Sequence, residues 1–120
     1  MLCWNEKVEK ISLLGLFYKT DINDDVEKAR SIPGAVLLDV RTKQEYLERR
    51  IPGSINLPLD ELENAAEKIG DKDTPVFVYC LSGGRSARAG RYLKSMGYRN
   101  VTDIGGISRY KGTIERGTTK

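Results

Sequence analysis

Apolar residues along this chain gather in short runs that are separated by more polar segments. Residues 16–20 (LFYKT), 35–40 (AVLLDV) and 75–79 (PVFVY) each predict a strand. The last two show almost no alternation of apolar and polar positions, which is typical of strands buried on both faces of a parallel sheet. Two shorter runs, residues 55–57 and 100–104, predict further strands.

The segments between these runs carry helix signals. Asp21 or Asn23 can cap a helix that extends to about residue 30 and has acidic residues in its first turn. Thr42 and Glu45 form a capping box that opens a helix through about Arg49. Three more helices are predicted, over residues 60–69 before Gly70, over residues 86–96 before Gly97, and in a short stretch opened by Gly105 and Gly106.

Strands that alternate with helices pair in parallel through right-handed crossovers. The sequence therefore predicts an α/β fold, an open parallel sheet with helices on both faces. Ligands of such sheets bind beyond the carboxyl ends of the strands. The residues expected on that rim are Arg41 after the 35–40 strand, Cys80 after the 75–79 strand, and Gly105 and Gly106 after the last strand.

The first 15 residues are predicted to form an N-terminal extension that precedes a domain over residues 16–120. Their apolar positions would line one face of an amphipathic helix that packs on the domain or on a second copy; these are Leu2, Trp4, Val8, Ile11 and Leu14. The run ISLLGLF has no small-residue cleavage site after it and is too short to span a membrane, so neither a signal peptide nor a membrane segment is expected.

The composition limits the possible chemistry. A chain of 120 residues with a net charge of +3 and interleaved acids and bases suits one domain and gives no reason to expect nucleic-acid binding. Histidine is absent, which excludes Cys-His and Ser-His catalytic pairs and histidine zinc sites, so no metal is expected. Cys3 and Cys80 lie far apart in unlike contexts, which favours a reducing, cytoplasmic location over a disulfide framework.

The richest chemical signal is the loop that begins at Cys80. Gly83 and Gly84 allow a sharp turn in which successive backbone N–H groups face one concavity. The predicted helix that follows adds the positive end of its dipole at the same place. Arg85 adds a fixed positive charge. This surrounding favours a thiolate at Cys80, which needs no histidine to activate it.

The run YCLSGGRS, from Tyr79 to Ser86, resembles the active-site loop of single-domain rhodanese-like sulfurtransferases. The run LLDVRTKQEYLERRIPGSINLP resembles the upstream signature of that family, and GYRNVTDIGGISRYKG resembles its closing segment. Together the three motifs cover about residues 16–117. The chain departs from the family at Arg49-Arg50, where Gly-His is usual, and at Tyr110, where Trp is usual. No role is carried over to the Arg50 position.

The resemblance implies a double displacement without a cofactor. Cys80 takes a sulfane sulfur from a donor such as thiosulfate or a protein persulfide, and passes it to cyanide or a thiol. The expected loop residues are Leu81, Ser82, Gly83, Gly84, Arg85 and Ser86, whose amides stabilise the anionic sulfur. Arg85 binds donor oxygens or braces the loop, with a local group compensating its charge at the helix N-terminus. Ser82 and Ser86 can donate hydrogen bonds to the anionic sulfur, and the preferred role of Ser86 is the helix N-cap. Asp39 and Arg41 are expected as supports on the rim.

Two alternatives belong to other classes. A cysteine phosphatase or arsenate reductase of related fold has five residues between its cysteine and arginine, whereas four separate Cys80 from Arg85 here. A non-catalytic sulfur-relay module needs the same loop, so the sequence does not separate it from an enzyme. Expected partners are a small-molecule donor and acceptor or a relay protein, with no nucleic acid and no membrane, in a monomer or homodimer. Cys3 has no supporting context, which leaves a sulfur relay there as the lesser alternative.

Overall fold

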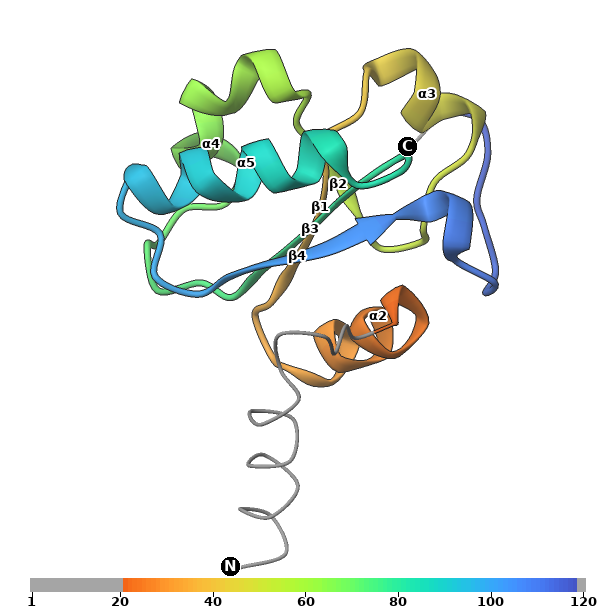
Figure 1. Ribbon diagram of the computed structural model, residues 1–120, viewed down its shortest axis with the longest axis horizontal. Helices are drawn as coiled ribbons and strands as arrows, with labels where there is room; N and C mark the ends of the chain where they lie inside the picture. The colour runs from red at the N-terminus through yellow and green to blue at the C-terminus, as the bar shows by residue number, and fades with distance from the viewer. Residues whose placement is uncertain (1–20, 119–120) are drawn as a thin grey trace, which may run out of the picture.

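A four-stranded parallel sheet lies at the centre of the computed structural model, which describes residues 21–118 (Figure 1). Its strand order is β2-β1-β3-β4, and all three pairings within the sheet are parallel. The strands are β1 (Val36–Asp39), β2 (Ile55–Asn56), β3 (Val76–Cys80) and β4 (Val101–Gly106). The predicted strand at 16–20, the N-terminal extension and Cys3 lie outside the described residues.

The central strand β3 is buried along its whole length, as its apolar sequence predicts. Successive side chains of a strand point to opposite faces of the sheet. Val76, Val78 and Cys80 therefore pack into the core on one face, and Phe77 and Tyr79 into the core on the other. The alternation places the Cys80 side chain on the same face as the helix that follows it.

Helices cover both faces of the sheet, which confirms the predicted α/β class (Figure 1). Helix α2 (Ile22–Ser31) packs on one face through Ile22, Val26 and Ala29. The other face carries α5 (Gly84–Ser95), the 3₁₀ helix η1 (Leu59–Asn64) and α4 (Ala65–Lys68). The short helices α3 (Lys43–Glu48) and η2 (Ile107–Arg109) follow the carboxyl ends of β1 and β4.

Two predicted helix starts are confirmed by their caps. The Asp21 side chain accepts a hydrogen bond of 3.0 Å from the Asn23 backbone N–H at the start of α2. The capping box of α3 is complete. Thr42 Oγ1 accepts from the Glu45 N–H at 3.1 Å, and Glu45 Oε1 accepts from the Thr42 N–H at 2.8 Å. Glu45 is thereby fixed at the first turn of α3.

The predicted bounds of one helix and one strand are wrong. The helix expected over residues 60–69 is divided into η1 and α4, with a non-helical φ of −118° at Glu61. The first residue of η1 is held near the end of β1, because the Leu59 N–H donates to Val40 O at 3.1 Å. β4 extends past the predicted strand end at Ile104 to Gly106, because Gly105 and Gly106 pair with Tyr79 and Cys80. The short helix predicted to open at these glycines is confirmed, since Gly106 is the N-cap of η2.

Arg50, at a departure from the family pattern, is a buried structural residue with 2% exposure. Its Nε donates to Glu115 Oε1 at 3.1 Å, and its Nη1 donates to Gly117 O at 2.8 Å and to Tyr46 O at 3.1 Å. The guanidinium also lies over the Tyr46 ring, 4.8 Å from its centroid. Arg50 therefore fastens the end of the chain to α3.

Within residues 21–118 no helix is long and apolar enough to cross a membrane.

Candidate active site

Cys80 is the last residue of β3 and lies beneath the loop that leads into α5. Its side chain is almost fully buried, with 1% exposure. The Gly83 N–H donates to Sγ at 3.0 Å, and the thiol donates to Ser86 Oγ at 3.5 Å. The sulfur thus has one backbone donor and one hydroxyl neighbour at the N-terminus of a 12-residue helix. Both neighbours can stabilise negative charge on sulfur.

Ser86 is not the N-cap of α5, contrary to the sequence prediction. The helix begins at Gly84, and the cap is Gly83, whose φ of +119° is one that glycine adopts without strain. Ser86 lies inside the first turn and is fully buried. Its hydroxyl is 3.1 Å from Gly83 O and 3.4 Å from Gly105 O, either of which it can donate to. Ser86 therefore connects the Cys80 loop with the end of β4.

Gly106 lets the end of β4 pass directly against the Cys80 loop. A Cβ at this position would lie 2.2 Å from Leu81 O and 2.6 Å from Ser82 Cα, so no larger residue fits without moving the loop. The Ser108 N–H donates to Leu81 O at 3.1 Å on the same side. The sequence placed Gly106 on the rim but gave no sign of this contact, because it depends on the pairing of β4 with β3.

Arg85 forms a two-point ion pair with Glu45 of α3. Nη1 lies 2.7 Å from Oε1 and Nη2 lies 3.0 Å from Oε2. The hydrogen bonds from Arg85 lower the pKa of Glu45 to about 2. This is the local compensation that the sequence predicts for a cation at a helix N-terminus, although the capping box does not by itself identify Glu45 as the partner. The pair braces the loop side of α5 against α3.

Asp39 and Arg41 form a second, fully buried pair at the end of β1. Arg41 Nη2 lies 2.7 Å from Asp39 Oδ2, and the Arg41 N–H donates to Asp39 Oδ1 at 2.8 Å. The same Nη2 donates to the backbone O of Arg49, just after α3. The two residues thus hold α3, which carries Glu45, in place. Among the hydrogen bonds and ion pairs within residues 21–118, none joins Asp39 or Arg41 to Cys80.

Tyr79 closes the opposite face of β3 beneath the loop. Its hydroxyl donates to Ser54 Oγ at 3.2 Å and accepts from the Ile51 N–H at 3.1 Å. Burial raises the pKa of Tyr79 well above its usual value, which keeps the phenol neutral.

Of the predicted loop residues, Leu81, Ser82 and Gly84 are exposed. No three potential metal ligands among residues 21–118 lie close enough together to hold a metal ion.

Comparison with known proteins places this arrangement in context. Residues 22–113 match the Rhodanese-like domain. Thiosulfate sulfurtransferase PspE of Escherichia coli is 39% identical over 71 residues, which are 58% of this chain and 68% of that protein. A solved structure described as rhodanese with anions from E. coli shares 34% identity and a TM-score of 0.65, covering 69% of this chain and 99% of the other.

A longer relative matches over more of the chain. The tRNA sulfurtransferase of Desulfurococcus amylolyticus is 34% identical over 91 residues, which are 75% of this chain. Those residues are only 18% of that protein, so the chain spans less than a fifth of its length.

Proposed function

The chain belongs to the rhodanese-like domain family, and we propose that it is a sulfurtransferase that carries a sulfane sulfur as a persulfide on Cys80. The observation that carries the proposal is the position of the Cys80 sulfur, which accepts the Gly83 N–H at 3.0 Å at the start of α5. A cysteine held in this way is activated by backbone groups and not by a base.

In the first half of the reaction, the Cys80 thiolate attacks the outer sulfur of the donor. With thiosulfate, the S–S bond of the donor breaks, a new S–S bond forms to Cys80, and sulfite leaves with the electron pair. The negative charge ends on the outer sulfur of the persulfide. No proton has to move, which suits a chain that contains no histidine.

In the second half, an acceptor attacks the outer sulfur of the persulfide. Cyanide forms thiocyanate, and a thiolate forms a new persulfide. In both cases the bond to the Cys80 sulfur breaks and the thiolate is restored. Because Cys80 is almost completely buried, the outer sulfur is the atom that extends toward the exposed loop residues Leu81 and Ser82 and meets the acceptor.

Backbone electrostatics support both steps. A preorganised N–H donor to a developing anion is commonly worth about 3 kcal/mol of barrier in enzymes. The Gly83 amide and the dipole of α5 act on the same sulfur. Ser86 can turn its hydroxyl from a backbone carbonyl to the sulfur when the sulfur becomes anionic. These three groups form the proposed anion cradle.

The pairing of Arg85 bears on the choice of donor. Glu45 neutralises the one cation among the loop residues Leu81–Ser86. The attraction of the loop for doubly charged thiosulfate is thereby weakened, whereas a protein persulfide loses little. The site therefore accepts persulfide sulfur from a protein at least as readily as from thiosulfate. Comparing the rate of Cys80 persulfide formation from thiosulfate and from a cysteine desulfurase tests this order.

The main experiment is intact-mass measurement after exposure to a sulfur donor. The native chain gains one sulfur atom from thiosulfate or from a cysteine persulfide, and cyanide removes it as thiocyanate. Cys3→Ser is the matched control, because it removes the other cysteine of the sequence and should gain the sulfur normally. Cys80→Ser should gain none.

Two results would count against the proposal. If the native chain gains no sulfur, or gains it equally in Cys80→Ser, then Cys80 is not the carrier. If the protein instead releases phosphate from an aryl phosphate and transfers no sulfur, it is a cysteine phosphatase. The four-residue gap between Cys80 and Arg85 favours the single sulfur atom over a tetrahedral oxyanion.

A further inference from the structure

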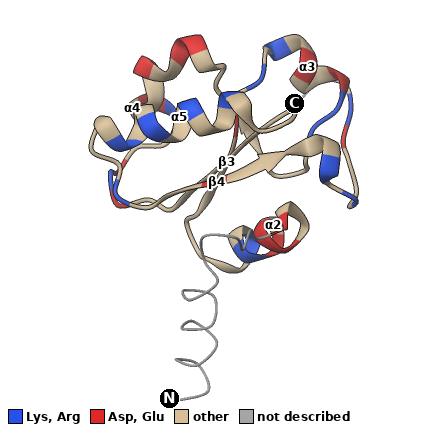
Figure 2. Ribbon diagram, in the orientation of Figure 1, with Lys and Arg blue, Asp and Glu red and all other residues tan. Residues whose placement is uncertain are grey.

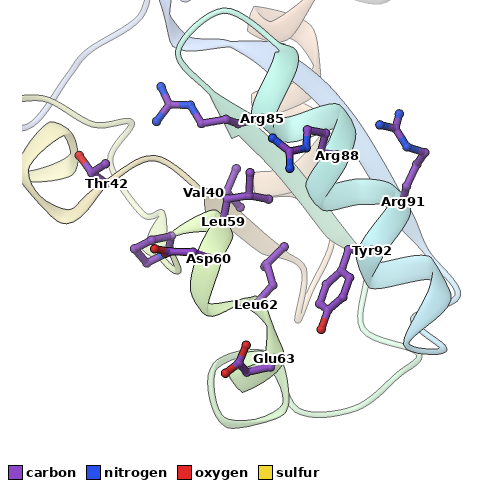
Figure 3. Close-up of a pocket in the computed structure, with 11 residues that line it drawn as sticks. Val40, Thr42, Leu59, Asp60, Leu62, Glu63, Arg85, Arg88, Arg91 and Tyr92 are labelled. Carbon is purple, nitrogen blue, oxygen red and sulfur yellow. The ribbon is translucent and has the colours of Figure 1, made fainter.

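A groove of about 640 Å³ lies between α5 and η1, beside the first turn of α5 (Figure 3). We propose that this groove docks a short acidic, partly apolar peptide segment of the protein that exchanges sulfur with Cys80. The proposal rests on the sulfur-transfer function proposed above. The groove is lined by Arg88, Arg91 and Tyr92 of α5 and by Asp60 and Glu63 of η1, with Leu59 and Leu62 at its floor.

One wall of the groove is a row of cations. Arg85, Arg88 and Arg91 follow one another at three-residue intervals along α5, and the helix contains no acidic residue (Figure 2). Like charges at this spacing repel one another across one helical turn. Arg85 is neutralised by Glu45, but Arg88 and Arg91 form no salt bridge with any residue in 21–118. An anionic ligand would relieve the repulsion between them.

The floor of the groove is apolar. Leu59 and Leu62 lie at its base, and Tyr92 stands at its end (Figure 3). Tyr92 is 44% exposed, and within residues 21–118 only Leu81 is a comparably exposed large hydrophobic side chain. Exposed aromatic side chains beside a polar rim are typical of protein contact sites. A small inorganic anion makes no use of this floor, whereas a peptide with an apolar side chain does.

The facing wall sets the orientation of the segment. Asp60 and Glu63 of η1 are exposed and line the side of the groove opposite α5. Their carboxylates repel acidic side chains and can accept hydrogen bonds from peptide N–H groups. The acidic side chains of the segment are therefore held toward Arg88 and Arg91. The two walls together select an acidic segment in one orientation.

The length of the groove suits a peptide of a few residues. Arg85 and Arg91 are six residues apart, which is about 9 Å along a helix that rises 1.5 Å per residue. An extended chain covers that distance with about three residues at 3.3 Å each. The Arg85 end of the groove adjoins the Cys80 loop. A cysteine placed just beyond the docked segment therefore reaches the persulfide.

The transfer that follows docking is balanced. The thiolate of the segment attacks the outer sulfur of the Cys80 persulfide, and a new S–S bond forms on the segment. The S–S bond to Cys80 breaks, and its electron pair returns to Sγ as thiolate. One persulfide is exchanged for another, so no oxidant or reductant is consumed.

The test uses a blocked peptide that contains one cysteine, then glycine, then leucine and phenylalanine flanked by glutamates. A second peptide has lysine in place of each glutamate. Binding of each labelled peptide to the full chain is measured by fluorescence anisotropy, which needs no persulfide. The acidic peptide should bind the native protein about tenfold more tightly than the lysine peptide, a difference of about 1.4 kcal/mol.

The decisive variant is Arg88→Glu/Arg91→Glu, with Lys68→Glu/Lys94→Glu as its matched control. Both change the net charge equally, but Lys68 and Lys94 are exposed residues that do not line the groove. The groove variant should bind the acidic peptide at least about tenfold more weakly and prefer the lysine peptide. The control should change binding of either peptide by less than about twofold, because its exposed charges lie outside the groove and act on the peptide only through screened solvent.

Sulfur transfer to cyanide separates this proposal from the proposed function. The groove variant should release thiocyanate at the native rate while losing transfer to the acidic peptide. Equal weakening by the groove and control variants would overturn the docking proposal, as would a native protein that binds both peptides alike. Displacement of the peptide by equimolar inorganic pyrophosphate would also overturn it, in favour of a small-anion site. Failure of the native chain to form a persulfide would instead defeat the proposed function, and the anisotropy result would stand by itself.

Discussion

Arg85 at the Cys80 loop and Glu45 at the start of α3 are 40 residues apart in sequence and form a two-point ion pair at 2.7 and 3.0 Å. Glu45 also closes the capping box with Thr42. One carboxylate thus fixes the start of α3 and the first turn of α5 together. The charge of the loop is set by this contact between two helices that flank the carboxyl ends of β1 and β3.

The Glu45→Gln variant should lose stability in a pH-dependent way. The pKa of Glu45 falls from 4.5 to about 2 in the folded chain, so folding stabilises the ionised form of this side chain. The native protein therefore has its full excess of unfolding free energy over the variant above about pH 4.5, and this excess is lost as the pH falls through about 2. For a partly exposed pair we expect about 1 kcal/mol at pH 7. Urea unfolding of both proteins between pH 2 and 7 measures it.

Glu48→Gln is the control for this measurement, because Glu48 is an exposed carboxylate on the same helix with no salt bridge within residues 21–118. Its unfolding free energy should follow that of the native protein at every pH. A Glu45→Gln deficit that stays constant from pH 7 to pH 2 would show that the loss comes from the capping geometry and not from charge.

Gly106→Ala should impair sulfur transfer more than folding. The added Cβ would lie 2.2 Å from Leu81 O, so the backbone of the Cys80 loop has to move. We expect a destabilisation of about 1–3 kcal/mol and a fall in persulfide formation of at least about tenfold. Gly90→Ala, inside helix α5, is the control, since its Cβ would meet Val101 Cγ1 at 3.9 Å and Asp103 Cβ at 4.0 Å, which are ordinary van der Waals distances. A Gly106→Ala protein with native transfer rates would contradict this account of the loop.

Ser86→Ala should slow persulfide formation, because it removes the hydroxyl beside the Cys80 sulfur. It also leaves Gly83 O and Gly105 O without this donor, which costs about 1 kcal/mol. The control is Ser95→Ala at the other end of α5, where an exposed hydroxyl bonds Tyr92 O. Rates of persulfide formation, from single-turnover mass measurements, should fall only in Ser86→Ala. Equal rates in the two variants would make Ser86 purely structural.

Arg50→Met should loosen the end of the chain from α3. The variant removes the donors to Gly117 O and Tyr46 O and the partner of Glu115. Because Glu115 is about half exposed and can be rehydrated, we expect a loss of about 1–3 kcal/mol, less than for a fully buried pair. Trypsin should cut after Arg116 faster than in the native protein.

Arg49→Met is the neighbouring control, since the Arg49 side chain is exposed and only its backbone O, which the variant keeps, accepts the hydrogen bond from Arg41. Its unfolding free energy should change by less than about 0.5 kcal/mol. If trypsin cleavage at Arg116 is equally fast in both variants, the buried guanidinium of Arg50 does not hold the chain end.

The sequence by itself determined the features that depend on neighbouring residues. The unbroken apolar run of β3 predicted burial on both faces, and the pattern Thr42 to Glu45 predicted a capping box, because both signals lie within one strand or one helical turn. The order of strands and helices predicted the parallel sheet. The position of Cys80 before two glycines and a helix identified the candidate nucleophile.

Only the tertiary structure decided the contacts between segments that are far apart in the chain. The pairing of β4 with β3 drew Gly105 and Gly106 into the sheet and brought Gly106 against Leu81. The positive φ of Gly83 moved the helix start ahead of Ser86 and turned that hydroxyl inward. Glu45 neutralised Arg85 because α3 follows β1 and α5 follows β3, and these two strands are neighbours in the sheet. These outcomes follow from packing geometry, which local sequence patterns do not encode.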